Sequence, residues 1–406
     1  MFKFWIFGFF YSVAISQAAI ANDQKIHINT SLTYNTIKTL GIQNGLRSTN
    51  QKKITKFGIG YDLNNLSSQL RLNHDGNSQF NLDGSYIQYT KGIATFGFGT
   101  IDRHWSFSNN ASLILSNNAR PSKSIYMKLN NKFGLDWLPS EANWSLEFFN
   151  GYTEGSLSNT QSMLLGTRAI LSPIAGLDLE LIQTSQWGGK GYNSNMSALS
   201  SALFLDTNAG SNSNINKMAG FGISYLKPSN IIPLRFYGQM IGEDEAGLFP
   251  SCYTYLAGIE WPNTKIKYPT VVGVETVNTR VDSTEHGFCG PNTMYNNNTY
   301  DYTNYGKVMG AEIDTEGTSL GLYVRTQISQ AINIEYSIKS VVINDNNWSN
   351  HRLSSKHETG LINSLSTSWN KNSIRFNGSI HYQNFSLDKA DIKKGYGVSL
   401  YSSITF

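Results

Sequence analysis

The segment Gly395-Tyr-Gly-Val-Ser-Leu-Tyr-Ser-Ser-Ile-Thr-Phe406 is the stretch that decides the fold. Along an extended chain one face carries apolar side chains, namely Tyr396, Val398, Leu400, Ile404 and Phe406. Ser399, Ser403 and Thr405 fall on the other face, so the period of two predicts a strand with one apolar and one polar side. A last strand ending in an aromatic residue is typical of an outer-membrane barrel that closes on itself. An edge strand of a soluble sandwich alternates in the same way, so this segment alone leaves both folds open.

The same alternation recurs along most of the chain after residue 24. In 373–385, Ile374 and Phe376 alternate with Arg375 and Asn377. Strands are expected near 25–36, 54–61, 66–74, 80–90, 93–101, 123–133, 143–152, 162–170, 177–187, 217–226, 232–241, 253–260, 265–278, 319–327, 331–341, 359–370, 373–385 and 394–406, which makes eighteen. Helical periodicity is nearly absent, and only Met196–Leu205 predicts a few helical turns.

The connections between these strands sort by length. If the C-terminus is periplasmic, the inner connections are short, as in Lys91-Gly92 and Lys371-Asn372. The outer ones are mostly long, namely 37–53, 102–122, 188–216, 242–252, 279–318 and 342–358. Short periplasmic turns and long extracellular loops are typical of outer-membrane barrels, whereas the loops of a sandwich have no reason to sort in this way. The expected fold is therefore all-β, a transmembrane antiparallel β-barrel of about eighteen strands with long extracellular loops and at most a short helix.

Composition agrees with an exported barrel. Charged residues make up 15 % and aromatic residues 13 % of the chain, and the net charge is only +4. The absence of a basic stripe argues against nucleic acid as a partner. Lys3, the apolar run after it and Ala19-Ile20-Ala21 predict a signal peptide over 1–21, followed by a barrel over 22–406 in the outer membrane.

Chemistry-bearing motifs are few. Cys252 and Cys289 form an even pair in an exported chain, which predicts a disulfide between two outer loops; a metal site would have only His286 as a further nearby ligand. The seven histidines occur without a Gly-x-Ser-x-Gly or His-Glu-x-x-His motif, so an enzyme is not expected, nor a metal or cofactor. Glu243-Asp244-Glu245 is open to three interpretations: paired carboxylates for acid–base work, a cation site or a solvated loop.

The long loops favour sugar binding. Trp105 and Trp187 follow strand ends among Asn, Arg and acidic residues, and an indole ring stacks on the apolar face of a pyranose while amides and charges bind its hydroxyls. The alternative is that each Trp lies at the membrane interface. The candidate polysaccharide-binding residues are Arg103, Trp105, Asn117, Asn118, Arg120, Trp187, Glu243 and Asp244. Arg103 and Arg120 suit an acidic glycan, although they could instead pair with Glu243–Glu245 and close the lumen.

An ordered series of motifs resembles the Wzi family of capsule assembly proteins. The series is Trp105 with Ser112-Leu-Ile-Leu-Ser116-Asn-Asn-Ala-Arg120-Pro121, Gly166-Thr-Arg168, Gln186-Trp187-Gly188-Gly189, Met218-Ala-Gly220, Tyr237-Gly-Gln239, Gly242-Glu243-Asp244-Glu245, Gly258-Ile-Glu260 and Tyr305-Gly306-Lys307-Val-Met-Gly310. Two departures are visible. Lys307 stands where the family has Arg, which removes a planar bidentate donor, and the family's periplasmic helical bundle has no counterpart in this sequence beyond Met196–Leu205.

The resemblance implies an outer-membrane barrel with a lumen blocked by loops, which binds capsular or surface polysaccharide and helps its attachment or assembly at the cell surface. A general diffusion porin is the alternative function, because inward residues of both charge signs also suit a water-filled channel. Expected partners are the polysaccharide, outer-membrane lipid, and the barrel assembly machinery through the C-terminal strand that ends at Phe406.

Overall fold

The computed structural model describes residues 24–40, 53–74, 80–132, 142–154, 161–204, 215–227, 232–246, 249–263, 266–282, 289–297 and 299–406. The expected signal peptide and His286 lie outside these residues. No helix within them is long and apolar enough to cross a bilayer.

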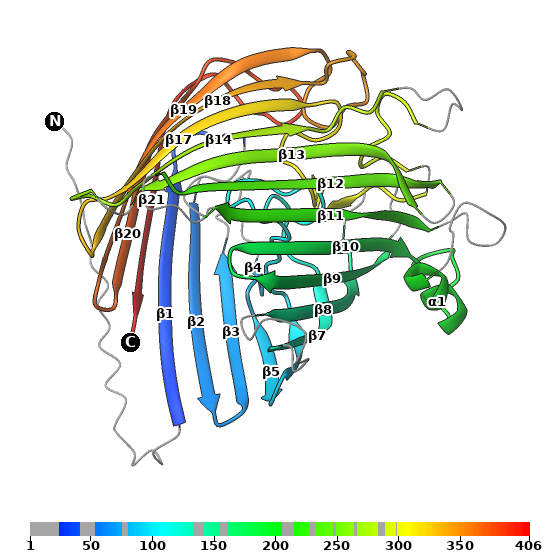
Figure 1. Cartoon of the computed structure of the whole chain (residues 1–406), viewed down its shortest axis with the longest axis horizontal. Coiled ribbons are helices and arrows are strands. Elements are labelled where there is room, and N and C mark those ends of the chain that lie inside the picture. Colours follow the sequence, from blue (N-terminus) through cyan, green and yellow to red (C-terminus); the bar gives the residue numbers. More distant parts are fainter. Residues whose placement is uncertain are drawn as a thin grey trace.

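The described chain forms one closed antiparallel sheet (Figure 1). Its strands are β1 (Gln24–Asn35), β2 (Lys53–Leu63), β3 (Leu66–His74), β4 (Phe80–Asn81), β5 (Tyr86–Lys91), β6 (Ala94–Gly99), β7 (Lys123–Lys132), β8 (Asn143–Tyr152), β9 (Met163–Ile174), β10 (Leu177–Trp187), β11 (Asn216–Lys227), β12 (Leu234–Ala246), β13 (Phe249–Asn263), β14 (Thr270–Asn278), β17 (Thr318–Gln327), β18 (Ile332–Ile343), β19 (Glu358–Lys371), β20 (Ile374–Gln383) and β21 (Gly395–Thr405). The pair β15 (Thr303–Asn304) and β16 (Lys307–Val308) is separate, and the one helix of the described residues is α1 (Met196–Phe204).

Eighteen strands make the barrel wall when the two-residue strand β4 is set apart, so the count expected from the sequence is confirmed for the described residues. The barrel closes between β1 and β21, from the pair Asn29↔Thr405 to the pair Asn35↔Ser399. Closure leaves no free sheet edge, so a strand of another chain has no exposed edge to pair with.

Wall side chains alternate between the two faces. On β20 and β21, Phe376, Ile380, Val398 and Leu400 are exposed on the outer surface, as are their counterparts on other strands. Asn377 is buried on the inner side. An outward apolar surface with an inward polar one is what a barrel in lipid requires.

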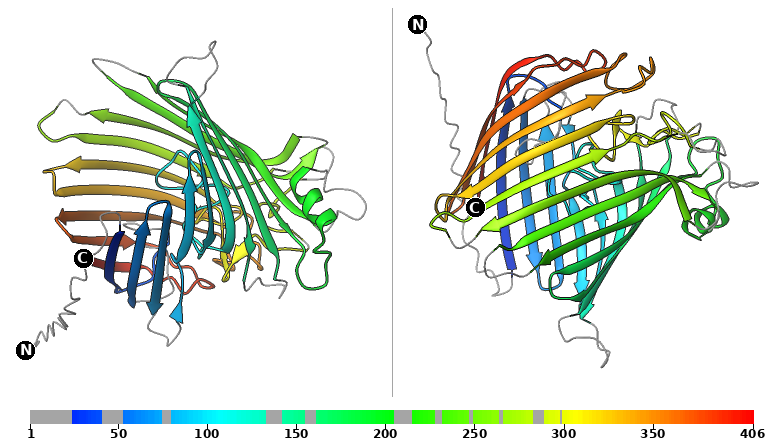
Figure 2. Two further views of the ribbon diagram at one scale, coloured as in Figure 1. Left: turned by 90° about the horizontal axis from the view of Figure 1, so that it is seen from below. Right: turned by 45° about the horizontal axis from the view of Figure 1, so that its top comes forward.

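Two-residue turns join strands at one end of the barrel. Asn64, Gly92, Gly176 and Asn372 occupy these turns with positive φ, a conformation that glycine and asparagine adopt at low cost. The long connections lie at the other end, and several fold back into the lumen (Figure 2). We call the two ends the short-turn end and the loop end.

One predicted connection is wrong. The range 242–252 was expected to be a long outer loop, but β12 and β13 continue through most of it, with Asp244 paired to Ser251 and Glu245 to Pro250. This hairpin extends past the apolar part of the wall, where neither face must be apolar. The alternation that reveals a strand is therefore lost there although the ladder continues.

Candidate functional site

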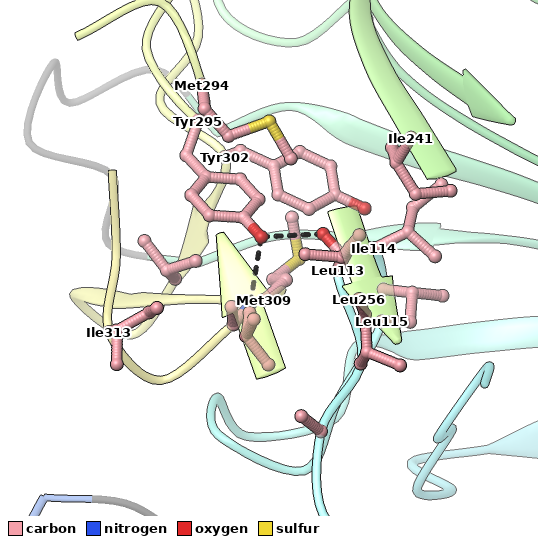
Figure 3. Close-up of a cluster of buried hydrophobic side chains, with 14 of the residues drawn as sticks. Leu113, Ile114, Leu115, Ile241, Leu256, Met294, Tyr295, Tyr302, Met309 and Ile313 are labelled. Atoms are coloured by element: carbon pink, nitrogen blue, oxygen red, sulfur yellow. Dashed lines mark hydrogen bonds between the residues drawn. The ribbon is translucent and has the colours of Figure 1, made fainter. Parts of the chain in front are cut away.

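The lumen is filled by four connections from the loop end, whose described residues we call the plug: 100–122, 279–317, 344–357 and 384–394. Leu113, Ile114, Met294, Tyr295 and Met309 form its apolar centre, packed against inward side chains of the wall (Figure 3). The plug therefore has a hydrophobic core of its own, which the barrel wall encloses.

Tyr295 joins two of the plug connections. Its hydroxyl donates to the Leu113 carbonyl over 2.6 Å and accepts from the Ala311 amide over 2.9 Å. The ring stacks on Tyr302 with centroids 5.9 Å apart. Burial raises the pKa of both phenols, so the hydroxyls keep the protons that these hydrogen bonds use.

The connection 100–122 runs deep into the barrel and returns. At mid-depth Gln239 of β12 accepts from the Leu113 amide over 2.9 Å and donates to the Trp105 carbonyl over 2.7 Å. Nearer the short-turn end, Arg325 of β17 donates to the Asn110 side chain over 2.5 Å. Backbone polar groups that leave water must be paired, and here the inward polar side chains of the wall do this.

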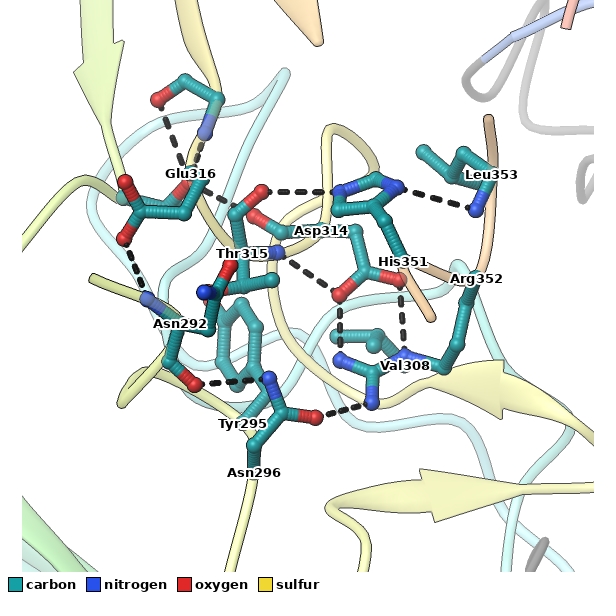
Figure 4. Close-up of polar contacts among 12 residues, drawn as sticks. Asn292, Tyr295, Asn296, Val308, Asp314, Thr315, Glu316, His351, Arg352 and Leu353 are labelled. Atoms are coloured by element: carbon teal, nitrogen blue, oxygen red, sulfur yellow. Dashed lines mark hydrogen bonds and ion pairs between the residues drawn. The ribbon is translucent and has the colours of Figure 1, made fainter. Parts of the chain in front are cut away.

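A charged cluster ties 344–357 to 279–317 (Figure 4). Arg352 contacts both carboxylate oxygens of Asp314, with an Nε–Oδ2 distance of 2.8 Å, and also donates to Asn296. His351 Nε2 lies 3.0 Å from the Thr315 carbonyl. Burial opposes ionisation of Asp314, but Arg352 outweighs it and the pKa of that carboxyl is lowered. Burial lowers the pKa of His351, which leaves the imidazole neutral near pH 7.

At the loop end the plug leaves a small crevice of about 110 Å³. Lys307, Arg352 and Lys389 lie around it together with Asn118 and Glu312. Cations, carboxylates and an amide in one crevice can bind the hydroxyl and acidic groups of a sugar chain.

Arg103 and Trp105 are buried between the plug and the wall. The Arg103 guanidinium pairs with Glu147 over 3.2 Å and lies 3.9 Å from the centroid of Phe149. Burial lowers the pKa of Arg103 to about 10, which still leaves it charged at neutral pH. Trp105 is 1 % exposed and meets the Phe149 ring edge to face. In this position neither face of the indole is open to a sugar or to lipid.

Trp187 ends β10 and packs against α1 on the outer side of the wall. It is 3 % exposed, contacts Leu165, Ala202 and Ile215, and donates from Nε1 to Asn150 over 3.3 Å. The predicted helix is thus present, and the indole supports it.

Asn117, Asn118 and Arg120 follow one another towards the loop end. Asn117 lines a lumen cavity, and Asn118 donates to the Val308 carbonyl over 2.9 Å. Arg120 pairs with both carboxylate oxygens of Asp83 at 2.8 and 3.0 Å and lies over the Tyr305 ring. These contacts link the connection to β15, β16 and the segment before β5.

Glu243 is buried in β12 and accepts from the Tyr295 amide over 3.0 Å. Asp244 follows it in the strand, and its side chain lies outside the described residues. The chain contains a disulfide between Cys252 and Cys289, with Cα atoms 5.2 Å apart. It ties β13 to the connection 279–317.

Two residues at the loop-end crevice, Arg352 and Lys389, were not foreseen, and Arg325 and Arg375 were expected on the polar faces of their strands but not as lining residues of one cavity. None of the four belongs to a recognisable motif, so the local sequence does not mark it. Among the described residues no group of three or more His, Cys, Asp or Glu side chains is placed to hold a metal ion.

Three comparisons place the chain among known proteins. A family model described as capsule assembly protein Wzi matches residues 15–395. An uncharacterised 55.8 kDa protein in the cps region of Klebsiella pneumoniae is 29 % identical over 187 residues, which are 45 % of this chain and 37 % of that protein. The match thus spans well under half the length of that relative.

Solved structures share the fold. The structure of Wzi, described as an outer-membrane protein involved in group 1 capsule assembly in Escherichia coli and a carbohydrate-binding β-barrel, superposes with a TM-score of 0.80 at 24 % identity, covering 93 % of this chain and 84 % of that one. OccD3 of Pseudomonas aeruginosa gives a TM-score of 0.55 at 11 % identity, covering 94 % and 91 %. OprD of the same organism gives 0.53 at 9 %, covering 95 % of each chain.

Proposed function

The chain belongs to the Wzi family of capsule assembly proteins, and from this premise we propose that it binds capsular polysaccharide at the cell surface. In this proposal the barrel resides in the outer membrane with its loop end outside, and it helps the polysaccharide attach or assemble there. The observation that carries the proposal is the plug: long outer connections fill the lumen instead of leaving a passage. A barrel closed in this way acts by binding, not by conduction.

The polysaccharide would bind at the crevice of the loop end. Lys307 and Lys389 bring positive charge to it, and Asn118 adds an amide. Because Arg352 is held by Asp314, its position is fixed before a ligand arrives, which lowers the entropy cost of binding. This chemistry favours an acidic glycan.

Six of the eight residues predicted from the sequence have one of two roles in this proposal. Asn118 and Arg120 lie near the outer surface and can contact the glycan or place those that do. Arg103, Trp105, Trp187 and Glu243 are buried, and they act by holding the plug and α1 in position. The proposal assigns neither role to Asn117, which lines a lumen cavity, nor to Asp244.

Substitution at the crevice tests this binding site. Lys307→Gln with Lys389→Gln should weaken binding of purified barrel to the capsular polysaccharide of its own source by about a hundredfold or more, since two charge-assisted hydrogen bonds are removed and each contributes about 1.5–3 kcal/mol. Lys91→Gln with Lys371→Gln, at the short-turn ends of β5 and β19, removes the same two charges elsewhere and should leave binding unchanged. Equal binding by all variants would remove the crevice from the proposal.

A deletion strain tests the cellular role. Without this protein the capsular material should be found in the medium instead of on the cells, and the wild-type gene should restore it. A strain that keeps its capsule on the cell, with a purified barrel that binds no glycan, would overturn the proposed function.

The second candidate function is a diffusion porin, because OccD3 and OprD share the barrel. That likeness concerns the fold alone, and the apolar centre of the plug speaks against a channel. Single-channel recording separates the two functions: steady conductance of porin size would favour the porin.

The proposal includes two further partners of the barrel wall, namely outer-membrane lipid and the barrel assembly machinery. The outward apolar residues suit outer-membrane lipid, and the last strand, with Phe406 exposed after it, suits recognition by the barrel assembly machinery. Replacing Phe406 with Ser should lower the amount of folded barrel in the outer membrane, measured by heat-modifiable mobility in gels.

A further inference from the structure

The lumen contains a second region with the chemistry of a binding site, which extends along β17 and β18 to the short-turn end, away from the crevice. Two cavities of about 470 and 430 Å³ share Arg325 and Glu335 as lining residues. The smaller one lies at the short-turn end, since Thr270 begins β14 and Gln327 ends β17. Each volume is within the range of about 300–1,000 Å³ that is usual for ligand pockets.

Polar side chains of several strands converge on this region. Asn109 and Asn110 at the tip of the plug face β17 and β18, and Asn333, Ser366 and Ser368 line the smaller cavity. Hydroxyls and amides can each donate and accept, which suits the ring of hydroxyls on a sugar better than an apolar ligand.

The charged side chains of the larger cavity already have partners, with Glu275 accepting hydrogen bonds from Ser108 and Tyr237 and the others forming ion pairs. Arg325 binds Glu335 over 2.6 Å, and Lys339 binds Glu312 over 2.5 Å. These pairs contribute no net charge, so they suit a neutral hydroxylated group and fix the side chains that would contact it.

Arg375 and Asn377, two inward residues of β20, differ from these paired charges because each has a polar group without a partner in the ranges that the structure describes. Arg375 lines the smaller cavity and has no charged or hydrogen-bonded partner among the described residues. Asn377 is 5 % exposed and lines the same cavity, and its Oδ1 lacks a hydrogen-bond partner within the described part of the chain. A buried amide oxygen without a partner is costly, and rotation of the Asn377 amide towards the cavity would let a bound hydroxyl satisfy it.

We propose that these cavities form a second saccharide pocket, open at the periplasmic end, that takes a short carboxylate-bearing oligosaccharide. The carboxylate would pair with Arg375, and a hydroxyl would donate to Asn377 Oδ1. Sugar rings would then extend towards Arg325 and the tip of the plug. The pocket is separated from the loop-end crevice by the plug, so the protein would contact polysaccharide on both sides of the membrane.

Calorimetric titration of the detergent-solubilised barrel tests the pocket. The probe is a tetrasaccharide of alternating glucuronic acid and N-acetylglucosamine, and maltotetraose is the neutral comparison. Arg375→Gln should weaken tetrasaccharide binding about tenfold, as expected for one charge-assisted contact, and leave the weaker maltotetraose binding unchanged. Asn377→Leu should weaken both. Lys394→Gln at the loop end is the matched charge control and should change neither.

A labelling experiment gives a second readout. The described residues contain no free cysteine, so Ser368→Cys introduces a single thiol in the smaller cavity. The tetrasaccharide should slow its reaction with a maleimide, and heat-modifiable mobility should show that each variant is folded. Absence of tetrasaccharide binding, unchanged affinity in both β20 variants, or unprotected labelling would overturn the pocket.

Failure of this pocket and failure of the proposed function are distinguishable. The Lys307→Gln and Lys389→Gln pair should reduce binding of the long capsular polymer and leave tetrasaccharide binding at β20 unchanged. Loss of tetrasaccharide binding in that pair would place the probe at the crevice and overturn the second pocket.

Discussion

A single amide on the wall determines where the deepest plug connection sits. Gln239 binds the Leu113 amide and the Trp105 carbonyl, and it also donates to Glu180 over 3.2 Å. The motif Tyr237-Gly-Gln239 was visible in the sequence. Its partners lie 126 and 134 residues away, so neither spacing nor periodicity indicates what the side chain does.

Replacing Gln239 with Leu should loosen this connection without breaking the wall. The buried Leu113 amide would lose its partner, at a cost of about 1–3 kcal/mol, whereas the Trp105 carbonyl would keep the hydrogen bond that the Ser112 hydroxyl donates to it. Hydrogen exchange should become faster over residues 105–115. Gln69→Leu on β3 makes the same change away from this contact and should leave that exchange as it is; equally slow exchange in both variants would contradict the role of Gln239.

Acid should weaken the contact between 344–357 and the rest of the plug. The pKa of His351 is lowered in the folded protein, so the unfolded chain binds more protons below about pH 6.5, the ordinary histidine value. The pKa of Asp314 is also lowered, so its contribution is present above about pH 3.9 and is lost as the pH falls further.

Both shifts have the same sign, so stability should fall below about pH 6.5 through His351 and again below about pH 4 through Asp314. Protease sensitivity of 344–357 in the detergent-solubilised barrel measures this. His351→Gln should flatten the upper part of the pH profile, between about pH 6.5 and 5. A profile that is the same with and without His351 would assign the acid response to another group.

At the level of elements, inward rings of the wall lie over glycines of the adjacent strand. Directly opposed pairs are Tyr126 with Gly97, Phe149 with Gly166, Tyr237 with Gly258, Tyr323 with Gly273, His27 with Gly60 and His381 with Gly397. A Cβ added at Gly258 would lie 2.2 Å from the Tyr237 ring. Because these rings lie flat along the wall, the lumen keeps room for the plug.

Gly258→Val should therefore push the Tyr237 ring into space that the plug occupies. It should also break the 2.8 Å hydrogen bond from Tyr237 to Glu275 and destabilise the barrel by about 1–3 kcal/mol, the usual cost of overpacking. The temperature at which the barrel loses its heat-modifiable mobility should fall. Gly378→Val has ordinary contacts for its new Cβ, at 3.5 Å or more, and should not lower that temperature.

Most elements could be predicted because the bilayer imposes a strict pattern on them. Every strand in contact with lipid must alternate, and the expected strands near 143–152 and 177–187 match β8 and β10. The pattern ends where lipid ends, which is why the extension of β12 through Glu243 was missed. The site was less predictable still, since Trp105 and Trp187 look alike in sequence and pack on opposite sides of the wall.

At the scale of the whole molecule, the plug is attached to the wall by one covalent link besides the chain itself. The Cys252–Cys289 disulfide joins residues separated by 37 positions. In the chain-entropy model a loop of this length corresponds to about 4 kcal/mol of stabilisation. The link therefore favours a docked 279–317 connection.

The Cys252→Ser, Cys289→Ser double variant should keep the barrel folded but let this connection leave the lumen part of the time. Brief openings should then occur in single-channel recordings, and a reductant should produce them in the wild type and have no added effect in the variant. Recordings as quiet as those of the untreated wild type would mean that the noncovalent contacts of Tyr295 and Asp314 suffice.

The deep course of the connection 100–122 also constrains the order of assembly. Its tip belongs to the first third of the chain, yet it is held by Gln239, Tyr295 and Arg325, which are synthesised later. A finished barrel would have to admit this hairpin-like segment through its mouth, past three other connections. The segment must therefore already lie against the growing sheet when β21 pairs with β1. Docking of 100–122 before the barrel closes is thus a slow step in the folding of this protein.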